Sequence, residues 1–412
     1  MFFPILVLIV SLIVSYHIFS VWRGLSLYQV TPSKENLLKA VRVTPSNPDP
    51  YYRLGLFYEW DLQNVDLRKS LDFFREAAER NPLEQQYWLN MAKVFLRVGE
   101  KEASEKTLEK AVFVYPTSYQ GRWITGNLLL QQGAIDKALP HFSYLLSHYP
   151  NQSGLVYDVL QRAIGDTEFI LGRIVPKDSS SLKQYLAYLY ETGDKESVRK
   201  AWGRKASFGY QEDRKETLRY IEFLISQGEF TEAFEVWKAR LQEEKILPPS
   251  DGNLITNGGF EKEKILGGGF DWKIEEVKGA HNSLDRSIAF EGKSSLKIVF
   301  NGKENIDFFH VYQFVPLKPG AEYLLKARAK TKDVTTKSGV KIEVFGTGPA
   351  FGATSESLVG DKGWTELMVS FRTPARSQGG VVRIRREKTD KFDRLISGTV
   401  WIDDVRLIEK NR

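Results

Sequence analysis

Three prolines, Pro82, Pro116 and Pro150, recur at intervals of 34 residues. A fixed period of this length is typical of a repeat array, in which each unit buries its apolar face only against its neighbours. Residues of similar type stand five, eight and twelve positions before each proline. They are Ala77, Ala111 and Leu145; Phe74, Leu108 and Phe142; and Ser70, Ser104 and Ala138. Because proline lacks a backbone N–H and clashes with the preceding turn, it ends the second helix of each unit.

These positions resemble the tetratricopeptide repeat, a pair of helices packed through small and large residues. Gly99 and Gly133 mark the turn inside two of the units, and Gly193 and Gly228 mark two later units. The unit after Pro150 departs from the pattern, and a lone helix over Lys34–Val43 precedes the first unit. The resemblance covers roughly residues 33–245 and implies an all-α solenoid.

A solenoid of this kind presents a concave groove lined by its first helices. The resemblance implies that a protein or peptide docks there, while the alternative is that the side chains only cover the surface. On the repeat register the groove residues are Tyr52, Leu56, Glu59, Lys93, Arg97, Trp123, Asn127 and Gln131.

The N-terminal segment Phe2–Trp22 holds no Asp, Glu, Lys or Arg. A bilayer-spanning helix needs ~20 apolar residues, so the segment is long enough to be a transmembrane anchor. A cleaved signal peptide is the alternative, but the segment lacks a basic start and a small-x-small cleavage site. Arg23 after the segment favours a cytoplasmic flank. The C-terminal domain favours the opposite side, and we expect the soluble part to be extracytoplasmic, as in a periplasm.

The chain contains no Cys, which excludes disulfides, thiolate metal sites and Cys nucleophiles. Its formal net charge is +6. The basic excess lies mainly after residue 250, and this favours acidic partners for the C-terminal region.

The pattern changes at Pro248–Gly252, where two prolines and a glycine predict a linker. Short apolar-alternating runs separated by Gly-, Pro- and Asn-containing turns follow, and they predict an all-β sandwich or jelly roll. The expected strands are Ser294–Phe300, Tyr323–Lys330, Val340–Phe345, Glu366–Phe371, Val381–Arg385 and Thr399–Leu407.

Both ends of this region resemble the xylanase-type carbohydrate-binding modules, which are galactose-binding-like jelly rolls. Asn253–Glu261 (NLITNGGFE) matches the opening strand and Val400–Val405 (VWIDDV) the closing strand. Between them, Gly292–Ile298 and Gln313–Leu317 match further strands. The resemblance spans about 253–409 and implies glycan binding.

The same family often holds a structural calcium ion, which needs several hard oxygen ligands. Glu261 and Asp404 lie on the first and last strands, which this fold places side by side. We therefore expect calcium ligands at Glu261 and Asp404. The alternative is that Asp403 and Asp404 simply end a strand pair.

Outward-facing residues of the predicted strands are basic and partly aromatic. Arg supplies a planar fork that matches sugar hydroxyls and carboxylates. We expect an acidic or polar polysaccharide on this face, whereas the alternative is a solvated face that keeps the sheet unpaired. The candidate carbohydrate-binding residues are Lys326, Arg328, Glu343, Phe345, Arg383 and Arg385. Trp272, Trp364 and Trp401 are expected in the core.

Motifs for other chemistry fail. A phosphate-binding loop ending at Gly292–Ser294 would need glycine where Ser287 stands. The five His residues show no metal spacing, no Gly-x-Ser-x-Gly elbow is present, and no nucleic-acid module is recognised.

The sequence thus predicts a multidomain protein with an N-terminal transmembrane helix (1–23), an all-α helical-repeat solenoid (33–247) and an all-β jelly-roll sandwich (253–409). We expect a non-enzymatic membrane scaffold with a protein partner on the repeats and a polysaccharide on the sandwich. Two alternatives stay open. One is a structural assembly factor whose sandwich binds protein, and the other is an accessory subunit of a glycan-processing or export enzyme.

Overall fold

The computed structural model describes residues 2–29, 33–63, 65–210, 213–246, 252–348 and 350–410. The chain forms two compact units, Met1–Tyr210 and Gln211–Arg412. The predicted linker falls almost entirely on residues 247–251, which lie outside the described residues. Each unit is described separately below.

The first unit begins with helix α1 (Phe2–Gln29), whose side chains are exposed from Pro4 through Phe19. Within the described chain, Pro4–Gln29 is the helix long and apolar enough to cross a membrane, although a signal sequence meets the same criteria. The last turns of α1 pack on helix α2 (Lys34–Val43), which has the predicted bounds. Here Ser20 Oγ donates to the carbonyl of Val43 at 3.1 Å, and Tyr28 is buried.

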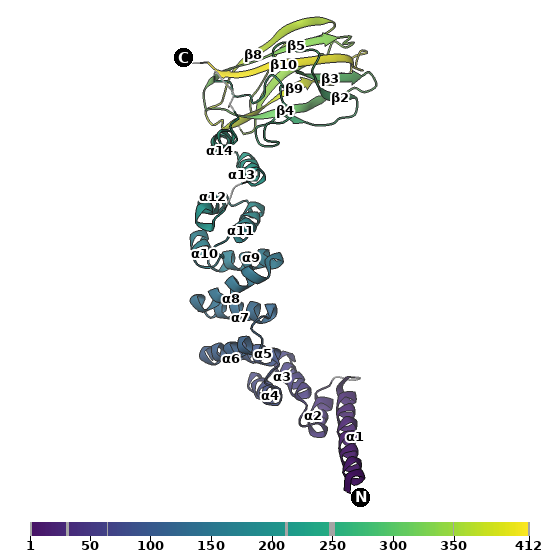
Figure 1. Ribbon diagram of the computed structural model, residues 1–412, viewed down its shortest axis with the longest axis vertical. Coiled ribbons are helices and arrows are strands. Elements are labelled where there is room, and N and C mark those ends of the chain that lie inside the picture. Colours follow the sequence, from purple (N-terminus) through teal and green to yellow (C-terminus); the bar gives the residue numbers. More distant parts are fainter. Residues whose placement is uncertain are drawn as a thin grey trace. The chain divides into compact units, whose positions relative to one another are not determined.

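The repeat helices follow as antiparallel pairs (Figure 1). Small residues let the helices of a pair approach closely, since a Cβ on Gly55 would lie 2.5 Å from Phe74 and one on Gly126 would lie 2.8 Å from Phe142. Each second helix ends just before a proline of the 34-residue period, so the repeat prediction is confirmed. The pairs are α3 (Pro48–Trp60) with α4 (Leu67–Arg80), α5 (Gln85–Arg97) with α6 (Lys101–Val114), and α7 (Tyr119–Gln131) with α8 (Ile135–His148).

The unit after Pro150 is irregular, as its sequence predicted. A 3₁₀ turn, η1 (Pro150–Gln152), precedes α9, and α10 has only seven residues. The remaining elements are α9 (Ser153–Ala163), α10 (Thr167–Arg173), α11 (Ser179–Thr192), α12 (Lys195–Gly203) and η2 (Lys205–Phe208). Gly193 caps α11 with a φ of 72°, a left-handed conformation that favours glycine.

The second unit contains the last helical pair, α13 (Arg214–Ser226) and α14 (Phe230–Glu243), together with the β-sandwich. A loop of the sandwich inserts into this pair. The ring of Phe270 lies 5.1 Å from that of Phe234 and 6.0 Å from that of Trp237, and Trp237 is fully buried. The last repeat helices therefore share an apolar core with the sandwich.

The sandwich consists of two antiparallel sheets, as predicted. Sheet A has the order β2-β3-β10-β5-β8, and its strands lie side by side in Figure 1; sheet B has the order β1-β4-β9-β6-β7. Sheet A comprises β2 (Ala280–Asp285), β3 (Ser295–Asn301), β5 (Glu322–Lys332), β8 (Lys362–Arg372) and β10 (Ser397–Glu409). Sheet B comprises β1 (Lys273–Ile274), β4 (Phe308–Pro316), β6 (Lys341–Gly346), β7 (Gly352–Thr354) and β9 (Gly379–Arg386).

The sandwich core is built from the inward residues of each strand, following the period of two. On β5 the buried residues are Tyr323, Leu325, Ala327 and Ala329, as the alternation predicted. Trp272 is buried in the core, as expected. Trp401 is buried instead on the outer face of sheet A, where the ammonium groups of Lys297 and Lys330 each lie 5.8 Å from its ring centre. Trp364 was expected in the core, but it is only partly buried and its ring packs edge-on against that of Phe290 at 5.8 Å.

Candidate functional site

The outer surface of sheet B carries a group of polar and aromatic side chains from three adjacent strands. We call this surface the sheet-B face and define it by Phe309 and Tyr312 on β4, Glu343 and Phe345 on β6, and Arg383 and Arg385 on β9. The β-ladders align Tyr312 with Arg383 and Arg383 with Glu343. Since Val382 and Ile384 between the arginines are buried in the core, Arg383 and Arg385 point outward.

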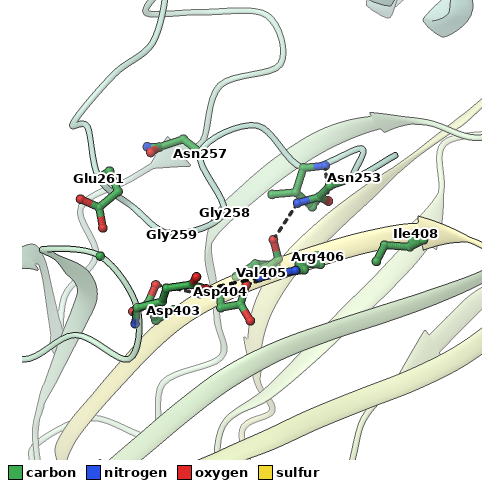
Figure 2. Close-up of a pocket in the computed structure, with 13 residues that line it drawn as sticks. Asn253, Asn257, Gly258, Gly259, Glu261, Asp403, Asp404, Val405, Arg406 and Ile408 are labelled. Carbon is green, nitrogen blue, oxygen red and sulfur yellow. Dashed lines mark hydrogen bonds and ion pairs between the residues drawn. The ribbon is translucent and has the colours of Figure 1, made fainter. Parts of the chain in front are cut away.

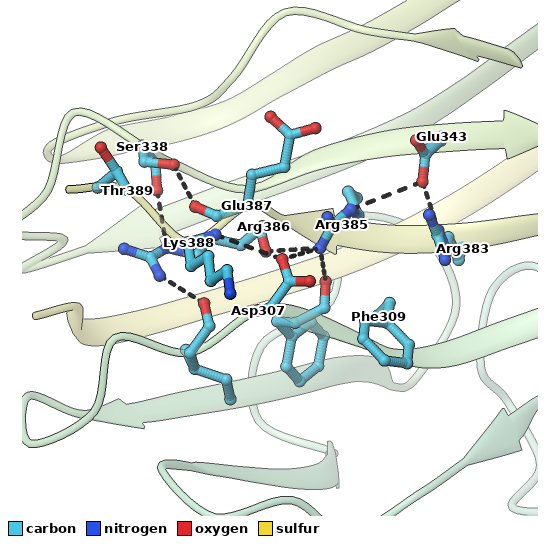
Figure 3. A network of polar contacts seen from close by, with 12 residues as sticks. Asp307, Phe309, Ser338, Glu343, Arg383, Arg385, Arg386, Glu387, Lys388 and Thr389 are labelled. Carbon is cyan, nitrogen blue, oxygen red and sulfur yellow. Dashed lines mark hydrogen bonds and ion pairs between the residues drawn. The ribbon is translucent and has the colours of Figure 1, made fainter. Parts of the chain in front are cut away.

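Two arginines of this face are held by carboxylates (Figure 3). Arg383 Nε donates to Glu343 Oε2, and an Arg385 terminal nitrogen donates to Asp307 Oδ1 at 2.6 Å. Arg385 also interacts with Glu343, since its Nε lies 3.8 Å from Glu343 Oε2. Burial is the largest single effect on Asp307 and raises its pKa, but the hydrogen bonds and charges of Arg385 and Lys388 together lower the pKa below its ordinary value. These ion pairs fix the guanidinium planes before any ligand arrives.

Aromatic rings lie against the same arginines. The Arg383 guanidinium is 4.4 Å from the ring centre of Phe345 and 5.6 Å from that of Phe309. Phe309 is 40% exposed and stacks on the ring of His310 at 4.5 Å. A flat exposed ring beside oriented N–H donors and carboxylate acceptors is suited to a ligand with apolar C–H faces and many hydroxyls.

The structure does not bring all six predicted carbohydrate-binding residues together. Glu343, Phe345, Arg383 and Arg385 lie on the sheet-B face, whereas Lys326 and Arg328 lie on β5 in sheet A. The physical reason is that β5 pairs with β10 and β8 rather than with β6, although β6 follows it in the chain.

Arg328 has surroundings much like those of Arg383, but on the other sheet. It forms an ion pair with Glu366 at 3.0 Å, and its guanidinium lies 4.8 Å from the ring centre of Phe290.

Sequence reasoning missed the aromatic contribution of β4, because the segment matched to a strand, Gln313–Leu317, covers only the end of β4 (Phe308–Pro316). Its sequence, FFHVYQFVP, contains alternating apolar residues, but the pairing with β9 shifts register between Phe308 and Val311. The irregularity leaves Phe309 exposed while Phe308 and Val311 are both buried. A run rich in aromatic residues was the available signal, but its outward residues do not follow from simple alternation.

A pocket of about 400 Å³ lies where the first segment of the sandwich meets β10 (Figure 2). Val405 N donates to the carbonyl of Gly258 at 2.9 Å, and Leu254 N donates to that of Leu407 at 2.9 Å. The predicted pairing of first and last strands is thus present, and it brings Glu261 and Asp404 to the walls of one pocket.

Both predicted calcium ligands have partners in the protein. Glu261 Oε1 accepts from the backbone N–H groups of Lys293 at 2.8 Å and Ser294 at 3.4 Å, and the Asp404 carboxylate pairs with Arg406. The neighbouring Asp403 is fully buried, and this burial raises its pKa although three backbone N–H groups lower it. A Cβ on Gly259 would lie 3.6 Å from Asp403 Oδ1 and 4.0 Å from Glu261 Oε1, so both carboxylates approach the same glycine.

Among the described residues no group of three or more His, Asp or Glu side chains is arranged to hold a metal ion. A calcium ion held by Glu261 and Asp403 would therefore need backbone carbonyls as its other ligands, and such oxygens are ordinary calcium ligands.

Most of the predicted groove residues contact their neighbours in the array. Glu59 is buried and forms an ion pair with Arg97 of the next first helix at 3.2 Å. Tyr52 accepts a hydrogen bond from Asn90 at 2.8 Å, and Lys93 donates to the same Asn90 at 3.2 Å. These contacts link α3 to α5 along one face.

The other groove residues also lie on first helices. Leu56 packs against the cluster that contains Phe74, and Trp123 stacks on Tyr119 with ring centres 6.1 Å apart. Asn127 donates to the carbonyl of Trp123, and Gln131 is exposed at the end of α7.

No family model matches this sequence, and no curated protein matches it. Similar solved structures include tetratricopeptide-repeat proteins and carbohydrate-binding modules. The CBM22-1 xylan-binding domain of Xyn10C from Paenibacillus barcinonensis is 13% identical over 40% of this chain and 99% of that chain, with a TM-score of 0.28. A family 16 carbohydrate-binding module is 22% identical over 38% of this chain and 100% of that chain, with a TM-score of 0.27. A thermophilic tetratricopeptide-repeat protein of Thermus thermophilus is 23% identical over 34% of this chain and 76% of that chain, with a TM-score of 0.29.

Proposed function

We propose that the chain is a non-catalytic, membrane-anchored scaffold. Its helical repeats dock a protein partner, and its sandwich binds a cell-envelope or extracellular polysaccharide through the sheet-B face. The observation that carries the proposal is the exposed Phe309 ring beside the ion-paired Arg383 and Arg385. We also propose that Glu261 and Asp403 hold a calcium ion in the pocket beside β10. The ion would offset the negative charges of these two carboxylates.

The charges of this face favour a neutral polar glycan over an acidic one. Arg383 pairs with Glu343, Arg385 pairs with Asp307, and Lys341 pairs with Glu387 at 3.2 Å. These three positive charges therefore each have a negative partner within the protein, and an acidic sugar bound to them would have to displace a carboxylate. Hydroxyl groups can bond to the free edges of these pairs without such a cost.

The same ion pairs support a non-catalytic role for the sheet-B face. Glycoside hydrolysis commonly requires a carboxylic acid that keeps its proton near neutral pH, which calls for a raised pKa. Asp307 has a lowered pKa because the hydrogen bonds and charges of Arg385 and Lys388 together outweigh the effect of burial. A carboxylate held ionised in this way orients an arginine rather than donating a proton.

The packing of α1 supports a retained anchor rather than a cleaved signal. A Cβ on Gly24 would lie 2.7 Å from the Thr44 side chain, and Tyr28 belongs to the apolar cluster of Leu37, Ala40 and Leu54. Cleavage between Ser20 and Tyr28 would cut into this cluster. Intact-mass measurement of the chain purified from membranes tests the point, and a mature start beyond Ser20 would argue against an anchor.

The proposal puts the soluble part outside the cytoplasm, because a cell-envelope or extracellular polysaccharide is met there. The repeats then supply a docking surface near the membrane, which is the common use of such arrays. The Arg97 guanidinium, 5.3 Å from the ring centre of the exposed Trp60, is a candidate contact for the partner on this surface.

A glycan array probed with the full-length protein tests the binding function. The protein is kept in a zwitterionic detergent, because glycoside detergents carry competing sugar head groups. Arg383→Ala is compared with Arg328→Ala, since both arginines lie on strands, pair with a glutamate and contact a phenylalanine, but on opposite sheets.

We expect saturable binding to neutral polysaccharides that weakens about tenfold or more in Arg383→Ala, a loss of ~1.4 kcal/mol. Binding by Arg328→Ala should stay within about twofold of the parent protein. Equal losses of affinity in both variants would show that the binding site does not lie on the sheet-B face. The absence of binding across the array would contradict the proposed function.

A further inference from the structure

Helix α14 covers one end of the outer surface of sheet B. Phe230, at the start of α14, is fully buried, and its ring lies 6.1 Å from that of Phe314 on β4. A Cβ on Gly379 of β9 would lie only 2.1 Å from the Phe230 ring. Val381 lies two residues further along β9 and faces the same outer side of sheet B. It is also buried, with only 6% of its surface exposed.

Helix α13 reaches the β1 edge of the same sheet. Lys273 on β1 aligns with Tyr312 on β4, and its ammonium group lies 3.5 Å from a carboxylate oxygen of Glu222 on α13. Tyr312 in turn donates its hydroxyl proton to Glu275 at 2.9 Å. The side chains at this edge are therefore engaged with one another and with the helix.

The uncovered part of the face is consequently small. The outward-facing residues of β9 are Gly379, Val381, Arg383 and Arg385. Gly379 lies beneath Phe230 of α14, and Val381, which is aligned with Phe314 and Phe345, is also buried. Arg383 and Arg385 are separated by ~7 Å along the strand, and β4, β9 and β6 together span ~10 Å across it. Beyond Arg385 the strand ends, since β9 finishes at Arg386.

We infer that the sheet-B face holds a short segment of a neutral glycan, on the order of two sugar rings by these strand spacings, and that α14 sets this limit. The inference rests on the proposed function and extends it. A sandwich with all four positions of β9 exposed would offer a surface about three times as long. Here the last repeat helix takes the place that further sugar units would occupy.

The dependence of affinity on chain length tests the inference. The probes are linear gluco-, xylo- and manno-oligosaccharides of one to six units, titrated calorimetrically into the full-length protein in a zwitterionic detergent. In the series that binds, we expect affinity to rise to the disaccharide or trisaccharide and then to change less than twofold up to the hexasaccharide.

An affinity that rises fivefold or more between the trisaccharide and the hexasaccharide would overturn the inference and leave the proposed function standing. If none of the three series binds at millimolar concentration, the result counts against the proposed function itself, and the inference falls with it. The two failures are thus distinguishable.

Phe230→Ala tests the role of α14 directly. Removal of the ring uncovers Gly379, so we expect the affinity of folded Phe230→Ala to keep rising beyond the trisaccharide. Thermal unfolding shows whether the variant is folded. If it is not folded, the dependence of affinity on oligosaccharide length in the parent protein tests the inference. An unchanged length dependence in folded Phe230→Ala would show that α14 does not set the limit.

Discussion

The ring of Phe230 on α14 lies directly over Gly379 on β9, so close that a Cβ atom on that glycine would come within 2.1 Å of the ring. Together with the insertion of Phe270 beside Trp237, this contact joins the last repeat helices to the sandwich. Glycine at position 379 is therefore required by a close approach between two elements rather than by a turn. The contact has a consequence for stability that can be measured.

Gly379→Ala should destabilise the second unit by about 1–3 kcal/mol, because the added methyl group overpacks a close contact. Denaturant unfolding followed by tryptophan fluorescence measures the change, since Trp237 lies in the same core. Gly363→Ala on β8 is the matched control, because no atom lies within 4 Å of its Cβ position. Adding Phe230→Ala to Gly379→Ala should recover part of the loss, and full additivity of the two changes would contradict the contact.

Arg386 is a second residue whose replacement should be costly. It is fully buried, and its guanidinium donates to the carbonyls of Ser338, Ile306 and Arg394 and to the side chain of Asn305. Arg386→Met leaves several buried acceptors unsatisfied, which predicts a loss of roughly 3 kcal/mol or more in the free energy of unfolding.

Arg386→Lys should not rescue the loss, because one ammonium group cannot reproduce the planar fork. Exposed Arg394→Met serves as the control and should change stability by less than ~0.5 kcal/mol. Near-parent stability of Arg386→Met would show that water satisfies these acceptors instead.

The repeats were predictable from the sequence because their signals are local. The spacing of Pro82, Pro116 and Pro150 determines where helices end, and Ser33 and Pro45 bracket α2 within a few residues of its ends. The joining of the first and last segments of the sandwich was predictable for a different reason. The resemblance carried by Asn253–Glu261 and Val400–Val405 supplied a long-range pairing that local pattern alone does not contain.

The candidate site was only partly predictable, because outward direction on a strand does not say which sheet the strand joins. Arg328 and Arg383 both alternate correctly with apolar neighbours, yet they lie on opposite sheets. Phe309 was missed since the register shift on β4 breaks the alternation. The cover provided by Phe230 depends on tertiary packing between segments about 150 residues apart, for which the sequence offers no local signal.

Calcium should stabilise the sandwich if Glu261 and Asp403 hold the ion. An ion at 100 times its dissociation constant adds ~2.7 kcal/mol to the free energy of unfolding, so millimolar calcium should raise the unfolding temperature by several degrees relative to EDTA. Glu261→Gln should abolish the shift, whereas Asp404→Asn should keep it, because Asp404 is paired with Arg406. Magnesium serves as the control ion. A calcium shift lost in Asp404→Asn would restore the ligand pair expected from the sequence, and no shift in the parent protein would exclude a structural role for calcium.

His141 on α8 should make the repeat array sensitive to mild acid. Burial lowers the pKa of this imidazole to about 4, with a further contribution from the nearby Arg122, whose nitrogen lies 3.4 Å from Nδ1. The folded state therefore keeps His141 neutral at a pH where the unfolded state, with a pKa near ~6.5, binds a proton. Since the unfolded state binds more protons, stability is full above pH ~6.5 and falls by up to ~1.4 kcal/mol per pH unit on the way down to about pH 4.

Other groups titrate in the same range, so the comparison that isolates this effect is the difference between the parent protein and His141→Gln. Unfolding free energies measured from pH 7.5 to pH 5 should fall more steeply for the parent protein than for His141→Gln. His148→Gln on the same helix is the control, because the His148 side chain is exposed at the end of α8. Parallel curves for the parent protein and His141→Gln would show that the imidazole titrates alike in the folded and unfolded states, and that its burial does not oppose its protonation.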